Sequence, residues 1–283
     1  MSRVAYVNGA YVPMASGALN VEDRGFQFSD GVYEVWSLLD GLLLDERAHL
    51  DRLERSLGAL RIPMPMPRGA LAAVLRETVR RNGLRNGLVY LQVTRGVAPR
   101  DHAFPAEAHP TIVVTARRID RAALARRQRD GVAVVTMPDI RWGRCDIKSV
   151  SLLPNVLAKQ AAREVGAYEA WLVDHDGFVT EGASSTAWIV DHDGALRTRP
   201  LSAAILPGVT RSVLMDRARE RQIGVVERPF TVAEAKAARE AFMSAASGAL
   251  TPIVAIDGVV IGEGTPGPVA TLLRAAYFEG AGR

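Results

Sequence analysis

Cysteine and lysine are both scarce in this chain of 283 residues. Cys145 is the only cysteine, which excludes an internal disulfide and a cysteine-clustered metal site and fits a reducing compartment. Lys148, Lys159 and Lys236 are the only lysines, so 32 of the 35 basic residues are arginines. Lysine can lose its proton and act as a nucleophile, whereas arginine stays charged. Each lysine is therefore a candidate reactive residue.

Long apolar runs and a targeting signal are also missing. No apolar stretch approaches the ~20 residues that a helix needs to cross a bilayer. The first ten residues lack the apolar core of a signal peptide, because Asn8-Gly9 interrupts them as a turn. We therefore expect a cytoplasmic protein that makes no membrane contacts.

The charged residues are balanced and dispersed. The net charge is only +4, and basic residues alternate with acidic ones in stretches such as 47–55 and 217–221. This alternation is typical of solvated, ion-paired helix faces and not of a stripe that binds nucleic acid. The GxxxxGK[ST] phosphate loop and the HExxH and GxSxG motifs are absent, and the five histidines lack metal-ligand spacing. We expect no nucleic-acid partner and no metal site.

The hydrophobic pattern predicts an α+β (mixed α/β) protein with largely antiparallel sheets. Asn8-Gly9 and Asp40-Gly41 are typical hairpin turns. We expect a smaller N-terminal α/β domain over residues 1–120 and a larger domain over 121–283. The expected strands are 4–7, 10–12, 31–39, 42–44, 88–94, 111–116, 132–137, 170–174, 186–190 and 241–243, with a hairpin at 253–261. The expected helices are 47–60, 69–81, 156–164, 210–221, 232–239 and 269–278.

Lys148 is the lysine whose surroundings suit a reactive amine. It is expected where a strand ends and a loop begins, with apolar residues on both sides. Desolvation lowers the pKa of an amine and makes it a nucleophile for carbonyl groups. From this segment alone, an ion-paired lysine at the surface or at an interface remains the alternative. Lys159 and Lys236 lie on expected helices and are interpreted as solvated.

Two further segments combine polar and small residues between regular elements. Glu181 precedes small and hydroxyl residues in the segment 180–186, where a ligand can approach the backbone and the carboxylate could hold a protonated heterocyclic nitrogen. A polar turn with a solvated glutamate is the alternative. Thr210 begins a helix after Pro207-Gly208, and a helix start can bind an anion or can simply be capped by the threonine.

These segments occur in the order found in fold-type IV pyridoxal-phosphate enzymes, and the chain most resembles the D-amino-acid (D-alanine) transaminases. The resemblance covers essentially the whole chain and implies the two-domain architecture of the class IV aminotransferases, with the cofactor at the domain interface. Its carriers are EDRGFQFSDGVYE at 22–34, HLDRL at 49–53, VTRG at 93–96, PRDH at 99–102, DIRW at 139–142, Lys148, LAKQ at 157–160, TEG at 180–182 and LPGVTR at 206–211.

The resemblance implies roles for residues that bind pyridoxal 5′-phosphate. Lys148 would hold the cofactor through a Schiff base and then move the proton of the substrate Cα. Glu181 would pair with the pyridine nitrogen and keep it protonated. Arg52 would bind the phosphate, because a forked guanidinium suits an oxyanion. Leu206 would pack against one face of the ring.

Further phosphate contacts are expected at a helix start and at a later turn. Val209 and Thr210 would contribute backbone amides, and Thr210 also its hydroxyl. Ala246 lies in the later segment, where the family usually has small hydroxyl residues and this chain has alanines at 245 and 246. Side-chain hydrogen bonds, each worth about 0.5–1.5 kcal/mol, would be lost there unless Ser247 replaces them.

A third group would select the substrate. Tyr33, Arg100 and His102 match the residues that bind the substrate α-carboxylate in the D-amino-acid transaminases, and the family supplies the arginine and histidine across a homodimer interface. The implied reaction is a ping-pong transamination between D-amino acids, such as D-alanine and D-glutamate, and 2-oxo acids. Branched-chain aminotransferases, (R)-amine transaminases and aminodeoxychorismate lyases are the alternatives. The first and last of these lack the PRxH pairing.

Overall fold

The computed structural model describes residues 3–279 and divides the chain into two compact units. The first contains the residues up to Ile119 together with Ile147–Ser151. The second contains Asp120–Asp146 and the residues from Leu152 onward. The expected division into 1–120 and 121–283 did not anticipate that Ile147–Ser151 belongs with the first unit. In the described part of the chain, no helix is both long and apolar enough to span a membrane.

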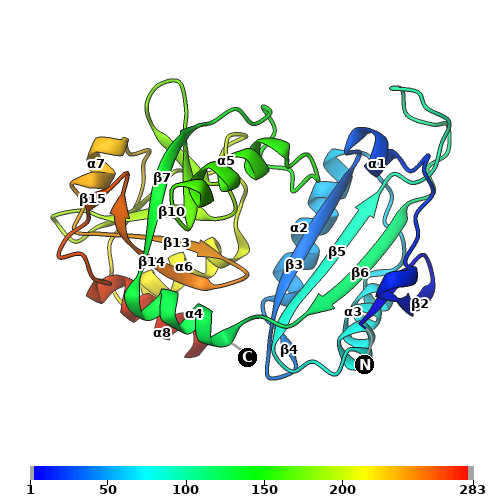
Figure 1. Cartoon of the computed structure of the whole chain (residues 1–283), viewed down its shortest axis with the longest axis horizontal. Coiled ribbons are helices and arrows are strands. Elements are labelled where there is room, and N and C mark those ends of the chain that lie inside the picture. Colours follow the sequence, from blue (N-terminus) through cyan, green and yellow to red (C-terminus); the bar gives the residue numbers. More distant parts are fainter. Residues whose placement is uncertain (1–2, 280–283) are drawn as a thin grey trace. The chain divides into compact units, whose positions relative to one another are not determined.

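The first unit contains a six-stranded sheet of order β2-β1-β6-β5-β3-β4, in which every neighbouring pair is antiparallel (Figure 1). Asn8 and Gly9 have positive φ in the first hairpin, as Asp40 and Gly41 do in the second, and both predicted hairpins are confirmed. The strands are β1 (Val4–Val7), β2 (Ala10–Pro13), β3 (Gly31–Leu39), β4 (Leu42–Leu43), β5 (Gly87–Thr94) and β6 (Thr111–Arg117).

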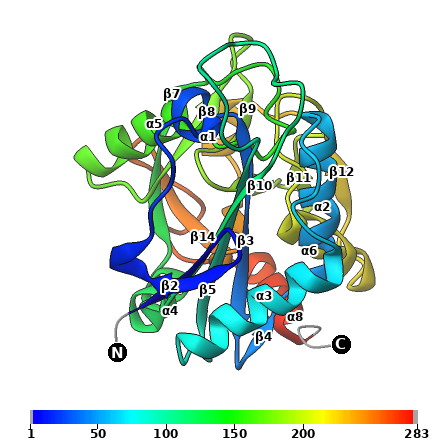
Figure 2. The same ribbon diagram turned by 90° about the vertical axis from the view of Figure 1, so that its right-hand side faces the viewer.

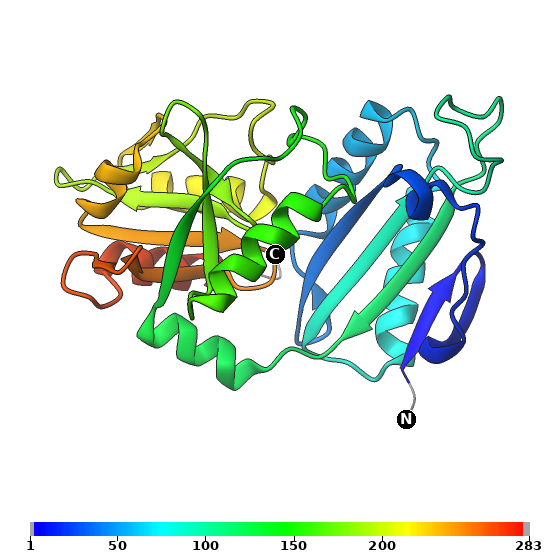
Figure 3. The ribbon, with the colours of Figure 1, turned by 45° about the horizontal axis from the view of Figure 1, so that its top comes forward.

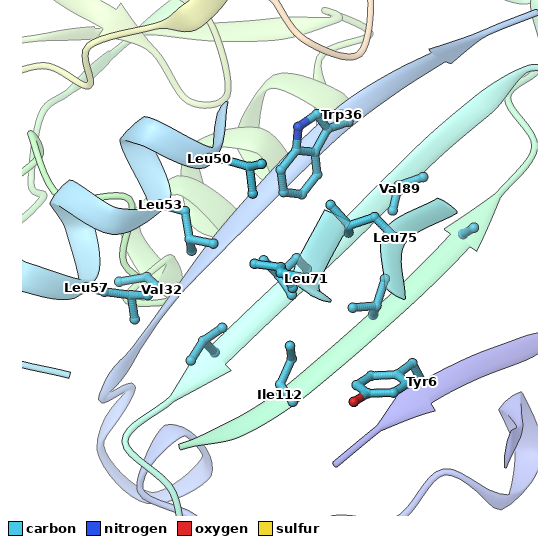
Figure 4. Packing of buried hydrophobic residues seen from close by; sticks show 14 of the residues in the cluster. Tyr6, Val32, Trp36, Leu50, Leu53, Leu57, Leu71, Leu75, Val89 and Ile112 are labelled. Carbon is cyan, nitrogen blue, oxygen red and sulfur yellow. The ribbon is translucent and has the colours of Figure 1, made fainter. Parts of the chain in front are cut away.

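Helices α2 (Glu46–Ala59) and α3 (Arg68–Arg81) cover one face of this sheet. Figure 2 shows α2 to the right of β3, and in Figure 3 both helices lie behind the strands. Side chains of a strand alternate between faces, so β3 directs Val32 and Trp36 toward the helices. Leu53 of α2 and Leu75 of α3 meet them in a core that is closed to solvent (Figure 4).

The same periodicity also buries polar side chains of the first unit. Glu34 occupies an inward position of β3 and is fully buried. On α2, His49, Arg52 and Ser56 are buried beside the leucine stripe at the helical spacing of three and four residues. A charged group at such a position needs a partner, and Glu34, His49 and Arg52 contact one another in the site described below.

The second unit contains a nine-stranded mixed sheet of order β12-β11-β10-β13-β14-β7-β8-β9, with β15 paired to β14. The pairs β11–β12, β14–β7 and β7–β8 are parallel. Among the described residues, five of the eight strand pairs of this sheet are antiparallel, so the expectation of largely antiparallel sheets holds for every pair of the first unit and for the majority in the second. The strands are β7 (Val132–Pro138), β8 (Glu169–Val173), β9 (Val179–Gly182), β10 (Thr186–Val190), β11 (Leu196–Thr198), β12 (Val225–Glu227), β13 (Glu240–Ala245), β14 (Ala249–Ile256) and β15 (Val259–Val260).

Three helices of the second unit, α5, α6 and α8, pack against this sheet by their apolar faces. Helix α5 packs on β7 and β8, whereas α6 and α8 pack against β13 and against each other. Helix α5 begins at Leu153, three residues before the predicted start, and α7 ends three residues before its predicted end. The helices are α4 (Arg121–Asp130), α5 (Leu153–Glu164), α6 (Val209–Glu220), α7 (Val232–Lys236) and α8 (Pro268–Glu279).

Several short or strongly charged elements had no counterpart among the predicted ones. They are α1 (Arg24–Phe28), a 3-10 turn at Met14–Ser16, α4, β9, β11 and β12. Helix α4 buries none of its residues, so its sequence carries no apolar stripe. The strands β9, β11 and β12 have three or four residues each, too few for an alternation to be recognised.

Candidate functional site

Lys148 lies in an irregular stretch between β7 and α5, and not at the end of a strand as predicted. Its backbone carbonyl and its backbone N–H are both hydrogen-bonded to other segments of the first unit. The Tyr33 N–H donates to the Lys148 carbonyl at 3.0 Å, and the Lys148 N–H donates to the Ser56 hydroxyl at 3.3 Å. Ser149 forms a bridge with Val32 of β3. The half-buried lysine is thereby attached to β3 and α2.

The amine of Lys148 lies against an aromatic ring. Its Nζ is 4.1 Å from the centroid of the Tyr33 ring, a cation–π arrangement that favours the side chain in this position. Tyr33 in turn stacks on Tyr90 at 5.7 Å between ring centroids. Burial raises the pKa of Tyr90 to about 12, and its hydroxyl donates to Gln92 at 2.8 Å. The lysine and Tyr33, two predicted site residues, are thus brought together.

Arg52, the predicted phosphate ligand, is held by Glu34 and His49. Arg52 Nε and Nη2 contact the two carboxylate oxygens of Glu34 at 2.7 and 2.8 Å, and His49 Nδ1 lies 2.8 Å from Glu34 Oε2. The bidentate pair fixes both the plane and the direction of the guanidinium. Arg52 is 8% exposed, so the cluster orients a buried cation at the inner face of α2.

The charges in this cluster follow from burial and pairing. Burial opposes ionisation of Glu34, but the charge and hydrogen bonds of Arg52 outweigh it and hold the pKa of Glu34 at about 2. Burial lowers the pKa of His49 in spite of the neighbouring carboxylate. At neutral pH the cluster therefore contains one carboxylate, one guanidinium and a neutral imidazole.

Glu181 ends β9 in the second unit and is also held by an arginine. Arg141 Nη1 donates to Glu181 Oε1, and the Leu206 N–H lies 3.2 Å from both carboxylate oxygens. Arg141 also contacts Asp139, which accepts a hydrogen bond from Thr180 at 2.7 Å. The two predicted residues Glu181 and Leu206 are therefore in contact, and Arg141 lies at the centre of this group.

The ion pairs around Arg141 keep its neighbours charged. Burial disfavours the charge of Arg141, but Asp139 and Glu181 raise its pKa above the ordinary value. Burial likewise opposes ionisation of Asp139, and Arg141 lowers its pKa. Burial raises the pKa of the nearby Cys145 thiol to about 11, and this thiol donates to the Trp142 carbonyl. At neutral pH Cys145 is therefore protonated and a poor nucleophile.

Helix α6 begins with backbone groups that no side chain caps. Its N-cap is Gly208, and the expected Thr210 lies inside the first turn, so the prediction that Thr210 is the N-cap is wrong. Thr210 is 3% exposed, and its hydroxyl oxygen has no hydrogen-bond partner among residues 3–279. A Cβ on Gly208 would lie 3.0 Å from the Thr186 hydroxyl. Val209 is buried beside them, so this helix start combines free amides with an unsatisfied hydroxyl.

The turn between β13 and β14 offers few side-chain donors to a phosphate. Ala246 and Ser247 lie in the turn between β13 and β14, and Ser247 is exposed. The buried Ser244 hydroxyl accepts a hydrogen bond from the Trp188 indole at 2.9 Å. Backbone groups around Ala246 are therefore what this turn can present.

Arg100 and His102 are exposed on the irregular segment between β5 and β6. The Arg100 guanidinium lies over the ring of Phe28, 4.7 Å from its centroid, and the His102 ring lies 5.3 Å from the same ring. The structure thus places these two predicted residues on one aromatic ring. Tyr33, the third predicted residue of this group, lies on β3 and contacts Lys148.

Sequence reasoning missed four residues that hold the predicted ones: Glu34, His49, Arg24 and Arg141. The inward position of Glu34 among Val32 and Trp36 is a signal that could have found it, because a charge on a buried face requires a partner. The interpretation of Lys159 as solvated is also wrong in part, since its amine lies 3.0 Å from the buried Glu169.

With this geometry established, the chain can be assigned to a family. The model of the family described as amino-transferase class IV matches residues 31–256. The chain belongs to the class IV aminotransferases, whose cofactor is pyridoxal 5′-phosphate.

Relatives and solved structures agree with this assignment. The D-alanine aminotransferase of Bacillus licheniformis is 38% identical over 95% of this chain and 94% of its own length. The D-alanine aminotransferase of Listeria innocua is 40% identical over 96% of this chain and 94% of its own length. The branched-chain aminotransferase of the archaeon Thermoproteus uzoniensis, solved with norvaline, has a TM-score of 0.85 and 25% identity over 99% of this chain and 94% of that one.

The donor groups of this chain fit the cofactor. The partnerless hydroxyl of Thr210 at the start of α6 and the buried guanidinium of Arg52 suit a phosphate. The carboxylate of Glu181 suits a protonated ring nitrogen, and Lys148 supplies an amine for the aldehyde.

We predict that Glu34→Gln lowers the free energy of unfolding by about 3–5 kcal/mol at pH 7, because it removes the carboxylate that is paired with the buried Arg52 guanidinium. The pKa of Glu34 is depressed from 4.5 to about 2 in the folded chain, so its stabilisation is complete above pH 4.5 and is lost as the pH falls toward 2. Denaturant unfolding at several pH values should therefore show a weaker acid dependence for Glu34→Gln than for the wild type.

The matched control is Glu77→Gln, which breaks the solvent-exposed pairs with Arg80 and Arg81 and should leave the unfolding midpoint nearly unchanged. An acid dependence of Glu34→Gln equal to that of the wild type would contradict the account of this cluster.

Proposed function

We propose that the protein is a D-amino-acid transaminase, which exchanges the amino group between D-amino acids, such as D-alanine and D-glutamate, and 2-oxo acids by a ping-pong mechanism. The observation that carries the proposal is the pairing of Arg100 and His102 on the Phe28 ring, because a cationic fork beside a second donor suits a substrate carboxylate. The D-alanine aminotransferases at 38–40% identity support the same conclusion.

We propose that Lys148 holds the cofactor through a Schiff base and that Arg52 binds its phosphate together with Val209, Thr210 and the backbone at Ala246. Glu181 would pair with the ring nitrogen, and Leu206 would pack against the ring. The supporting observations are the partnerless Thr210 hydroxyl and the Leu206 N–H that donates to Glu181.

Pyridoxal phosphate, when bound, supplies a ring that accepts the electrons left behind as the Cα–H bond of the substrate breaks. Lys148 Nζ would accept the Cα proton as the general base. Tyr33, whose ring faces this amine, limits where the lysine side chain can reach. Glu181 would keep the ring nitrogen protonated, and Arg141, which donates a hydrogen bond to Glu181 Oε1, would orient the carboxylate for this pairing.

The α-carboxylate of the substrate would be bound by Arg100, His102 and the Tyr33 hydroxyl. Arg100 offers a planar fork of donors, and the imidazole and phenol offer single hydrogen bonds. A substrate without a carboxylate would leave the guanidinium unpaired. The group would thus select amino acids over simple amines.

We propose further that the enzyme is a homodimer in which Arg100 and His102 serve the partner's site. Large apolar side chains exposed on α1 and α5 support an interface between copies: Phe26 is 79% exposed and Leu153 is 69% exposed. Val156 and Leu157 of α5 are exposed beside Leu153. A cytoplasmic location is part of the proposal, and the single cysteine fits it.

We predict that D-alanine converts the cofactor on the enzyme, whereas L-leucine and (R)-1-phenylethylamine do so poorly. Each compound is mixed separately with the cofactor-loaded protein, and the visible absorption of the bound cofactor is followed. A response to L-leucine without one to D-alanine would contradict the proposal and favour a branched-chain aminotransferase, the activity named for the Thermoproteus uzoniensis structure.

We also predict that Thr210→Val weakens cofactor binding by about 10- to 100-fold, the effect of one lost hydrogen bond to a charged group. The dissociation constant is measured by titrating the apoprotein with pyridoxal phosphate. The control is Thr78→Val, another buried helical threonine, whose hydroxyl donates only to the Val74 carbonyl. Equal affinities of Thr210→Val and the wild type would contradict the assignment of the phosphate to α6.

A further inference from the structure

The segment that carries Arg100 and His102 has little structure of its own. It connects β5 to β6 without a helix or strand, and an isolated bridge from Val97 to Asp23 is the pairing that the described residues show within it. Connections of this length are usually either functional or poorly ordered. Side chains that bind a carboxylate must nevertheless occupy fixed positions, so other parts of the unit have to hold the segment.

The ring of Phe28 is one such support. Arg24 and Phe28 are four residues apart and therefore lie on the same side of α1. The guanidinium carbons of Arg24 and Arg100 lie 4.8 and 4.7 Å from the ring centroid, and the His102 ring lies 5.3 Å from it. One aromatic ring thus contacts both residues of the proposed carboxylate site.

Arg24 holds the main chain between those two residues. Its Nη1 donates to the Asp101 carbonyl at 2.5 Å, and its Nη2 donates to the His102 carbonyl at 3.3 Å. Its Nε donates to Asp30 at 2.8 Å. Arg24 is 3% exposed, so these contacts are made away from water, where unpaired donors are costly.

Helix α1 is itself fixed against β5. Asp23 caps the helix by accepting a hydrogen bond from the Gly25 N–H and accepts a second one from the Thr94 hydroxyl. A Cβ on Gly25 would lie 2.2 Å from Thr94 Cγ2, so only glycine allows this close approach. The position of α1 is therefore set by the sheet that also carries Tyr33.

Asp30 connects this support to a second one. It accepts hydrogen bonds from Arg95 at 2.7 and 3.0 Å, and the Arg95 guanidinium lies 3.6 Å from the centroid of the Phe104 ring. Burial opposes ionisation of Asp30, but Arg95 and Arg24 outweigh it and lower its pKa. Arg24 thus contacts the segment at the carbonyls of Asp101 and His102, and Arg95 contacts it at the Phe104 ring. Both arginines pair with the same carboxylate, that of Asp30.

We propose that Arg24 and Phe28 are positioning residues, which hold the Arg100–His102 segment where it binds the substrate α-carboxylate. The inference rests on the proposed function and extends it to two residues to which neither the sequence nor the relatives assigned a role. Lysine cannot replace Arg24, because a single ammonium cannot reach Asp30 and two carbonyl oxygens in a planar fork.

The test compares Arg24→Lys with the wild-type holoenzyme. We expect the KM for D-alanine to rise at least about tenfold while kcat stays within about twofold, since ground-state and transition-state binding of the carboxylate are lost together. Affinity for pyridoxal phosphate should not change. Limited trypsin digestion, followed by mass spectrometry, should cut after Arg100 several times faster in the variant.

The matched control is Arg68→Lys. Arg68 also joins a carboxylate, Asp51, to a main-chain carbonyl, that of Arg47, but it lies on α3. This variant should match the wild type in all three measurements. An unchanged KM in folded Arg24→Lys, or a fall in kcat without a rise in KM, overturns the inference.

Two further outcomes are decisive. Failure of the wild type to turn over D-alanine contradicts the proposed function, and the trypsin measurement then tests the positioning by itself. If Arg24→Lys does not fold, Phe28→Leu replaces it, because this change removes the ring and keeps an apolar side chain. A rise in KM of several-fold supports the inference, and an unchanged KM overturns it.

Discussion

The attachment of Lys148 to β3 and α2 is the constraint on which the rest of the site depends. Both of its backbone amide groups are hydrogen-bonded, to Tyr33 and to Ser56, and the neighbouring Ile147 is buried in the core of the first unit. The chain on either side of Ile147–Ser151 belongs to the second unit. A flexible lysine side chain gains a defined reach only when its backbone is fixed in this way. The packing of one core thus decides where the amine of Lys148 lies.

Buried carboxylates in both units are each paired, which determines what they can do. Glu34 orients Arg52, and Glu181 is held by Arg141 and the Leu206 N–H. Glu169 accepts from the Ser184 hydroxyl at 2.7 Å. A buried ion pair contributes little net stability but is costly to break, so these pairs are better understood as fixing directions than as strengthening the fold. The segment of Arg100 and His102 is held by a similar set of ion pairs, in which Asp30 pairs with Arg24 and Arg95.

The sequence predicted elements that follow from strong periodicity or from turn chemistry, such as the leucine stripe of α2 and the Asn8-Gly9 hairpin. It could not predict that His49, Arg52 and Ser56 are buried beside those leucines, because polar residues at helical spacing normally indicate a solvated helix face. The resemblance assigned Lys148, Glu181 and Arg52, whereas the residues that hold them depend on tertiary contacts between distant segments. Arg24 contacts carbonyls about 77 positions away, a pairing that no local pattern contains.

The central claim is that Lys148 is the lysine that binds the cofactor. Borohydride reduction of the holoenzyme, followed by peptide mapping, tests it directly, because reduction makes the link between lysine and cofactor permanent. The account predicts a phosphopyridoxyl group on Lys148 and none on Lys159, which is paired with Glu169, or on Lys236, which is paired with Asp257. A label on Lys159 or Lys236 in place of Lys148 would contradict it.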